Sequence, residues 1–145
     1  MTNQTPTRAS PPLRIGPHAL ASPVLLAPMS GVSDLPFRRL VHRLGAGLVV
    51  SEMIASRELV RLRRDVLRRA ERPAHAPFVV QLAGHEARWM AEGARMAADL
   101  GADIIDINMG CPAKEVTGKL SGSALMRDLD HAVGLIEAVV AAVTV

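Results

Sequence analysis

The sequence predicts an α/β fold in which parallel strands alternate with helices. Short apolar runs of strand length recur four times, and each is followed by a stretch with apolar residues at helical spacing. This alternation is typical of parallel strands joined by right-handed crossovers. Two architectures fit it, a doubly wound open sheet and the first half of an eight-stranded barrel. With 145 residues, the chain is shorter than the roughly 250 of a complete barrel, so we expect a partial chain.

The composition is that of a globular protein with an aliphatic core. Hydrophobic residues make up 49% of the chain, which is enough to bury a core, whereas aromatic residues make up only 2%. The single cysteine excludes an internal disulfide and fits a reducing compartment, so we expect a cytoplasmic protein. The formal charge of +3 and the pI of about 10.0 permit an RNA partner without requiring one.

Neither end of the sequence predicts an export signal or a membrane span. Residues 1–12 are polar and contain three prolines without an apolar signal core, and we expect them to form a disordered lead-in. The most apolar stretch, Ala132–Val145, contains Glu137 and is shorter than a bilayer requires. We therefore expect no membrane contact.

Apolar runs predict the strands of the main sheet. They lie at Val24–Ala27, Leu48–Ser51, Phe78–Leu82 and from Ile104 onward, and Val143–Val145 predicts the start of a fifth strand. A Gly-Pro turn signal within Leu13–Leu20 predicts a small hairpin before the main fold.

Helical spacing and capping residues predict four helices. The first begins after a Ser33 or Asp34 cap, with Pro36 in its first turn, and ends at Gly45 and Gly47. The others are predicted at Arg57–Ala70, Glu86–Leu100 and Ala124–Val140. The arginines from Arg57 to Arg72 indicate a solvated helix face or, alternatively, an RNA-binding patch.

The stretch after the fourth strand contains the residues best suited to chemistry. Cys111 follows that strand directly, and ligands bind at the carboxyl ends of parallel strands. Alternation along the strand places Asp106 and Asn108 on one face, next to Cys111 if that face points inward. A lone cysteine is usually a small core residue, but its position in Asn-Met-Gly-Cys-Pro at a strand end favours a site.

These motifs together resemble those of the tRNA-dihydrouridine synthases, most closely the bacterial B-type branch. The resemblance covers about Leu13 to Val145 and rests on segments in the family's order: Leu26–Arg38, Ser51–Met53, Val80–Gly84, Asp106–Pro112 and Lys119–Leu125. It implies the N-terminal portion of a (β/α)₈ TIM barrel, truncated after about four βα units. Residues 13–145 would then be a partial FMN-binding barrel domain, without the second half of the barrel and the helical tRNA-binding domain.

The resemblance also implies an activity, namely the FMN-dependent reduction of uridine to 5,6-dihydrouridine in tRNA with NADPH as reductant. Hydride passes from the reduced flavin to C6, and Cys111 matches the cysteine that protonates C5. A thiol of ordinary pKa, about 8.5, is mostly protonated at neutral pH and can act as a general acid. No spacing typical of a metal site is present, so no metal is expected.

The family pattern assigns further residues of the site. Pro28, Met29 and Ser30 match flavin contacts of the first loop, and Gln81 matches a side chain that bonds the flavin ring. Substrate contacts are implied for Asn108 and Lys119, which together with Cys111 complete the candidate site.

Two other functions remain open at this stage. The first is a related flavin barrel that acts on a small molecule, which the Gly-Cys-Pro signature disfavours. The second is an inactive fragment with no catalysis of its own, in which unpaired strand edges favour self-association. The sequence does not predict the oligomeric state.

Overall fold

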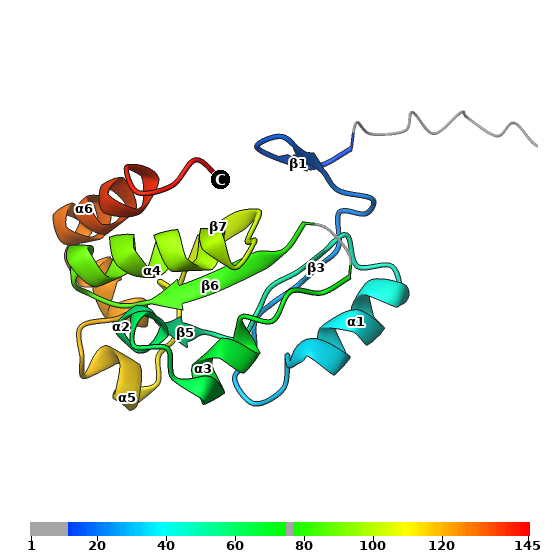
Figure 1. The fold of residues 1–145 in the computed structure, drawn as a ribbon. Coiled ribbons are helices and arrows are strands. Elements are labelled where there is room, and N and C mark those ends of the chain that lie inside the picture. Colours follow the sequence, from blue (N-terminus) through cyan, green and yellow to red (C-terminus); the bar gives the residue numbers. More distant parts are fainter. Residues whose placement is uncertain (1–11, 75–76) are drawn as a thin grey trace, which may run out of the picture.

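A computed structural model describes residues 12–74 and 77–145 as a parallel sheet flanked by helices (Figure 1). The predicted α/β class is confirmed. The predicted lead-in, residues 1–12, lies outside the described residues except for Pro12.

The strands are short and the helices vary in length. The strands are β1 (Arg14–Ile15), β2 (His18–Ala19), β3 (Leu25–Leu26), β4 (Leu48–Val49), β5 (Ile54–Ala55), β6 (Val79–Ala83) and β7 (Ile104–Ile107). The helices are α1 (Leu35–Arg43), α2 (Ser56–Val60), α3 (Arg64–Arg69), α4 (Ala87–Asp99), α5 (Lys114–Thr117), the 3₁₀ helix η1 (Gly122–Arg127) and α6 (Leu129–Val140).

The strand order distinguishes between the two predicted architectures. β3 pairs with β4, and a parallel bridge from Val50 to Val79 continues the β4 strand onto β6. β6 then pairs with β5 on one side and with β7 on the other, always in parallel. Each strand therefore neighbours the next one in the chain, whereas a doubly wound sheet reverses its order part-way. The order agrees with the first half of a (β/α)₈ barrel.

A bulge interrupts the second barrel strand. Val50 pairs with Val79 and Ile54 pairs with Leu82, so three residues lie between the pairs on one side and two on the other. An extra residue of this kind bends a strand and changes the direction of nearby side chains. It separates β4 from β5, a division that the sequence did not predict, and it falls at Ser51–Met53.

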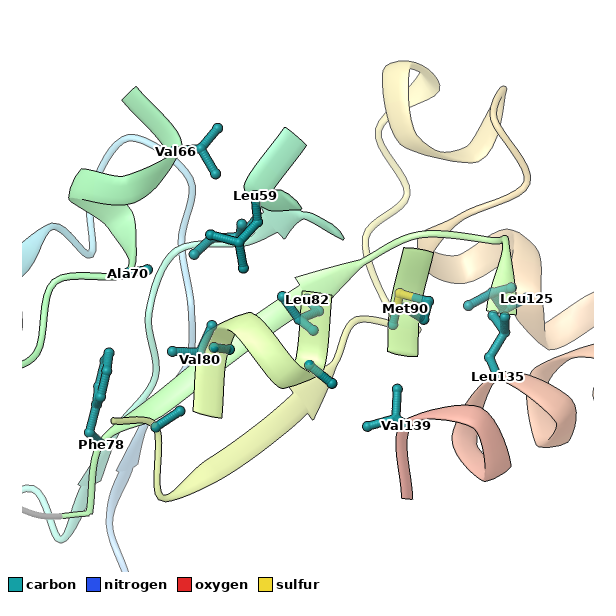
Figure 2. Packing of buried hydrophobic residues seen from close by; sticks show 14 of the residues in the cluster. Leu59, Val66, Ala70, Phe78, Val80, Leu82, Met90, Leu125, Leu135 and Val139 are labelled. Carbon is teal, nitrogen blue, oxygen red and sulfur yellow. The ribbon is translucent and has the colours of Figure 1, made fainter. Parts of the chain in front are cut away.

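The two faces of the sheet differ in the side chains that cover them. Val80 and Leu82 belong to the main core, where they pack with residues of α2, α4 and α6. Figure 2 shows this cluster extending from Phe78, at the start of β6, to Leu135 and Val139 of α6. The opposite face of β6 holds Val79 in a smaller apolar cluster and then Gln81.

The smaller cluster closes the amino-terminal end of that opposite face. It comprises Leu20, Leu48, Val50 and Val79, with Ile15 and Ile104 packed against it. Leu20 and Ile15 come from the β1–β2 segment, so the predicted hairpin is confirmed and it covers this end. Toward the carboxyl ends the same face becomes polar, with Gln81 and Asp106 paired in register.

Three details of the predicted helices and strands were wrong. The helix predicted at Arg57–Ala70, with Leu62 on its apolar face, is two helices. Leu62 lies between them with φ +57° and is 59% exposed. The region predicted as helical from Ala124 begins as the 3₁₀ helix η1 before α6. Val143–Val145 forms no strand in the described structure.

The other helices agree with the sequence. Asp34 caps α1 by accepting a hydrogen bond from the Phe37 N–H at 2.9 Å, and Pro36 lies in the first turn, as predicted. Helix α4 buries Met90, Ala94 and Ala97 at helical spacing, whereas Leu100, just after its last residue, is 40% exposed. No helix in the described part of the chain has the length and apolarity that a bilayer-spanning segment requires.

Candidate active site

A pocket of about 610 Å³ lies at the carboxyl ends of the strands. Its lining comes from the loop after β3, the bulge, β6, β7 and the segment after β7: Pro28, Ser30, Met53, Gln81, Ile107, Asn108, Met109, Gly110, Cys111 and Pro112. We call it the Cys111 pocket. Its lining contains no carboxylate, amine or guanidinium group among the described residues. Its volume falls within the usual range for a site that binds a cofactor or small molecule.

A chain of hydrogen bonds connects the strands beneath this pocket. The Gln81 Nε2 donates to Asp106 Oδ2 at 2.6 Å, and Asn108 Nδ2 donates to Gln81 Oε1 at 2.9 Å. The Asn108 Oδ1 then accepts from the backbone N–H of Cys111 at 3.1 Å. We call these contacts the amide chain.

The carboxylate of Asp106 sets the direction of every bond in the amide chain. An ionised carboxylate only accepts hydrogen bonds, so the nitrogen of Gln81 must face Asp106 and its oxygen must face Asn108. The nitrogen of Asn108 then faces Gln81, which leaves its oxygen for the Cys111 backbone. A charge on β7 thus fixes the orientation of two amides and anchors the residue with the thiol.

The segment after Cys111 folds back against it. The Ser123 N–H donates to the Cys111 carbonyl at 3.0 Å, and Gly122 adopts φ +62°. A Cβ atom at Gly122 would lie 2.6 Å from that carbonyl oxygen and 2.8 Å from Val116 Cγ1. Only glycine therefore fits here without displacing the cysteine segment. The sequence contained this glycine in a recognised motif, but its role became visible only in the structure.

The first loop is held by a buried carboxylate from the bulge. Glu52 is 8% exposed and accepts a hydrogen bond from the Gly31 N–H at 2.8 Å. Within the loop, Ser33 Oγ accepts from the Met29 N–H at 2.8 Å and lies 3.1 Å from the Met29 carbonyl oxygen, to which it donates. Ser51 completes the link to the amide chain, because its Oγ accepts from the Gln81 N–H at 3.0 Å.

A buried arginine lies behind this loop. Arg38 is 1% exposed, and its Nη2 donates to the carbonyls of Arg69 and Glu71 at 3.4 Å. Its Nε and Nη1 have no hydrogen-bond partner among the described residues. Burial lowers the pKa of the Arg38 guanidinium, and the carboxylates of Asp34, Glu52 and Glu71 oppose that shift. The guanidinium of Arg38 is close enough to the buried carboxylate of Glu52 for their charges to interact.

A second pocket, of about 250 Å³, lies at the same edge of the sheet. We call it the Trp89 pocket. Its lining includes Arg57, Glu58, His85, Trp89, Lys119 and Ser121. Unlike the Cys111 pocket, it contains both cationic and anionic side chains.

The structure brings together five of the seven predicted site residues. Pro28, Ser30, Gln81, Asn108 and Cys111 all line the Cys111 pocket. Met29 is 39% exposed and is absent from that lining, and Lys119 lines the Trp89 pocket instead. Among the described residues, no group of three histidine, cysteine or acidic side chains could hold a metal ion.

Comparison with known proteins identifies the family. The family model described as "Dihydrouridine synthase (Dus)" matches residues 25–145. The chain belongs to the dihydrouridine synthase family. The family recognised from the sequence motifs is therefore confirmed.

Two similar curated proteins are considerably longer than this chain. A "Probable tRNA-dihydrouridine synthase" of Rhizobium leguminosarum bv. phaseoli is 66% identical over 122 residues, which cover 84% of this chain and 38% of that protein. A protein of the same name from Rhodobacter capsulatus is 64% identical, over 86% of this chain and 39% of that protein. The chain thus spans about two fifths of the length of these dihydrouridine synthase relatives.

A third relative bears on the predicted branch of the family. The "tRNA-dihydrouridine synthase B" of Pseudomonas syringae pv. tomato is 51% identical over 134 residues, which cover 92% of this chain and 40% of that protein. A named B-type dihydrouridine synthase among the relatives agrees with the branch that the motifs indicated.

Proposed function

We propose that the protein that carries this sequence reduces uridine to 5,6-dihydrouridine in tRNA, with FMN as its cofactor and NADPH as the reductant. The observation that supports this most is the position of Cys111. Cys111 lines an uncharged pocket at the carboxyl ends of parallel strands, and the amide chain anchors its backbone. The chain that contains it belongs to the dihydrouridine synthase family.

The residues of the Cys111 pocket fit a flavin. The volume of about 610 Å³ and the mixture of apolar and neutral polar side chains suit a planar cofactor. Pro28 and Ser30, which line the pocket, would hold it from the first loop together with Met29 between them, and Gln81 would bond its ring. The Gln81 Nε2 uses one N–H on Asp106, so its second N–H is available for that bond. When bound, the flavin supplies the hydride that is added to C6 of the uracil.

Cys111 would supply the proton that completes the reduction. Adding a hydride to C6 leaves electron density at C5, which must accept a proton for the double bond to become saturated. The Cys111 side chain is partly exposed, and a thiol is a competent general acid at neutral pH. The net reaction consumes one uridine, one NADPH and one proton and yields dihydrouridine and NADP⁺.

The amide chain would position both partners of this reaction. Gln81 would contact the flavin. Asn108, which accepts from the Cys111 N–H at 3.1 Å and lines the same pocket, would contact the uracil. One network would thus hold both the residue that binds the flavin and the residue that carries the acid, and rigid positioning of this kind lowers a barrier. A stacked uracil cannot enter such a pocket, so the target base has to be extruded from the tRNA.

The decisive test is nucleoside analysis of tRNA. The purified protein is incubated with FMN, NADPH and an unmodified tRNA transcript, and the digested nucleosides are analysed by mass spectrometry. We expect dihydrouridine to form only when all three are present. Oxidation of NADPH by a small oxidised pyrimidine, with no dihydrouridine in tRNA, would overturn the proposal in favour of a small-molecule oxidoreductase.

A further inference from the structure

The Trp89 pocket contains an arginine that is held by an aromatic ring instead of a carboxylate. The guanidinium carbon of Arg57 lies 5.6 Å from the centroid of the Trp89 ring. No ion pair with Arg57 occurs in the described ranges 12–74 and 77–145. Arg88 also lies over this ring, at 5.0 Å, but it is paired with Glu92 at 2.9 Å. Arg57 therefore keeps its charge and its N–H groups for another partner.

The acidic residues of the pocket, Glu58 and Glu86, form no ion pair with Arg57 in the described structure. Glu58 pairs with Arg61 at 3.4 Å and with Arg63 at 3.5 Å. Glu86 Oε1 lies 3.9 Å from His85 Nε2, which is an ion pair only when the imidazole is protonated. Lys119, which also lines the pocket, is exposed and has no ion pair in the described part of the chain. Arg57 and Lys119 thus line one pocket, and neither forms an ion pair among the described residues.

The two helices that border the pocket, α2 and α4, pack tightly against each other. Helix α2 approaches the β6–α4 turn so closely that a Cβ atom at Gly84 would lie 2.6 Å from Ser56 Oγ and 2.8 Å from Met90 Sδ. Gly93 is similarly close to Ser56. These two glycines bring the start of α2, which contains Arg57, against the start of α4, which contains Trp89.

The Trp89 pocket adjoins the Cys111 pocket. Gln81 lines one and Ala83 lines the other, and two residues along a strand correspond to about 7 Å. Ser121 lines the Trp89 pocket, while the next residue, Gly122, lies against the carbonyl of Cys111. A ligand that fills the Cys111 pocket with one group can therefore place its neighbouring group in the Trp89 pocket.

We propose that Arg57, stacked on Trp89, and Lys119 bind the phosphate group of the nucleotide next to the extruded uridine of the RNA substrate. The inference rests on the proposed function, because it takes RNA as the substrate. A planar guanidinium that is stacked on a ring keeps its edge free for two parallel hydrogen bonds to phosphate oxygens. The ring also limits the entropy that Arg57 loses on binding.

The test is tRNA affinity measured over a range of salt concentrations. Arg57→Gln should weaken binding about tenfold at low salt, as expected for loss of a charge-assisted contact. It should also reduce the slope of log affinity against log salt by about 1, because one phosphate contact is lost. Arg43→Gln is the matched control: it removes the same charge from the end of α1, which leads into the amino-terminal end of β4. We expect it to change affinity less than about twofold.

Two further variants test the role of the stack. Arg57→Lys should restore the salt slope but not the full affinity, because an ammonium keeps the charge and loses the two-pronged geometry. Trp89→Leu alone should weaken tRNA binding. In the double variant with Arg57→Gln it should cause little further loss of affinity, because both changes remove the same contact between the ring-supported guanidinium and the phosphate. Additive losses would show that Trp89 contacts RNA independently and would overturn the stacked arrangement.

The outcomes separate this inference from the proposed function. If the wild-type protein forms dihydrouridine and Arg57→Gln binds tRNA like Arg43→Gln, the phosphate site is wrong and the function stands. If Arg57→Gln leaves tRNA affinity unchanged but weakens NADPH binding, the site belongs to the reductant and the inference is wrong. Failure of the wild-type protein to bind tRNA or form dihydrouridine overturns both.

Discussion

The two pockets at the carboxyl edge of the sheet differ in charge and in how their polar groups are held. In the Cys111 pocket the polar lining is neutral, and its amides are fixed by hydrogen bonds that begin at Asp106. In the Trp89 pocket, Arg57 and Lys119 have no carboxylate partner in the described structure. The difference indicates a division of labour between the pockets. The rigid, neutral Cys111 pocket would orient the reacting atoms, and the charged Trp89 pocket would bind the phosphates of the tRNA.

The segment from Cys111 to Ser121 contributes residues to the lining of both pockets. Cys111 lines one pocket and Lys119 and Ser121 line the other, and Gly122 joins the two ends of the segment by its contact with Cys111. If the division of labour is correct, changes in the Cys111 pocket reduce turnover without reducing tRNA affinity, and changes in the Trp89 pocket do the reverse. The following predictions test that statement, beginning with the largest effect.

Cys111→Ala should reduce dihydrouridine formation by about 10²–10⁴-fold, since a methyl group cannot supply the proton for C5. Turnover is measured by nucleoside mass spectrometry with unmodified tRNA. The visible flavin spectrum and the tRNA affinity of the variant should match those of the wild-type protein. Unchanged turnover would remove Cys111 from the role of acid.

Gly122→Ala should lower the free energy of unfolding by about 1–3 kcal/mol, because a Cβ atom would meet the Cys111 carbonyl and φ +62° disfavours alanine. Gly134→Ala is the control: Gly134 lies inside α6, where an added Cβ atom would meet nothing within 4 Å, so the change should stabilise by about 0.5–1 kcal/mol. Denaturant unfolding gives both values. Equal stability of the two variants would contradict the close contact between Gly122 and Cys111.

Asp106→Asn should reduce turnover about tenfold, the effect expected for loss of one hydrogen bond to a charged acceptor. An amide at this position can donate as well as accept, so it no longer fixes the direction of the amide chain. Steady-state kinetics with tRNA should show the loss in kcat. A loss of tRNA affinity with kcat intact would contradict the assignment of Asp106 to the reacting pocket.

Lys119→Gln should weaken tRNA binding about two- to fivefold, because an exposed charge contributes modestly in water. The flavin spectrum should not change. The result would sharpen the comparison, since Lys119 is on the same segment as Cys111 and yet lines the other pocket. If the variant loses bound flavin instead, the assignment of Lys119 to the Trp89 pocket is wrong.

The sequence predicted the parts of the fold that local patterns determine. The apolar runs located β3, β4, β6 and β7, and Asp34 with Pro36 located the start of α1. These features follow from side-chain period and capping chemistry within a few residues.

Features that depend on distant contacts were not predictable. Leu62 has good helix propensity, yet its backbone is left-handed in the turn between α2 and α3. The bulge at Ser51–Met53 is defined by its register against β6, which a single segment does not reveal. The sequence likewise placed Asp106 and Asn108 on one face, but the bonds through Gln81 required the pairing of β6 with β7.

The most direct test of the account is whether tRNA reoxidises the reduced flavin. The FMN-loaded protein is reduced anaerobically with limiting NADPH, unmodified tRNA is added, and the flavin spectrum is recorded. We predict that the oxidised spectrum returns and that dihydrouridine forms in an amount equal to the flavin reoxidised. A flavin that stays reduced with tRNA but is reoxidised by a small oxidised pyrimidine would contradict the account.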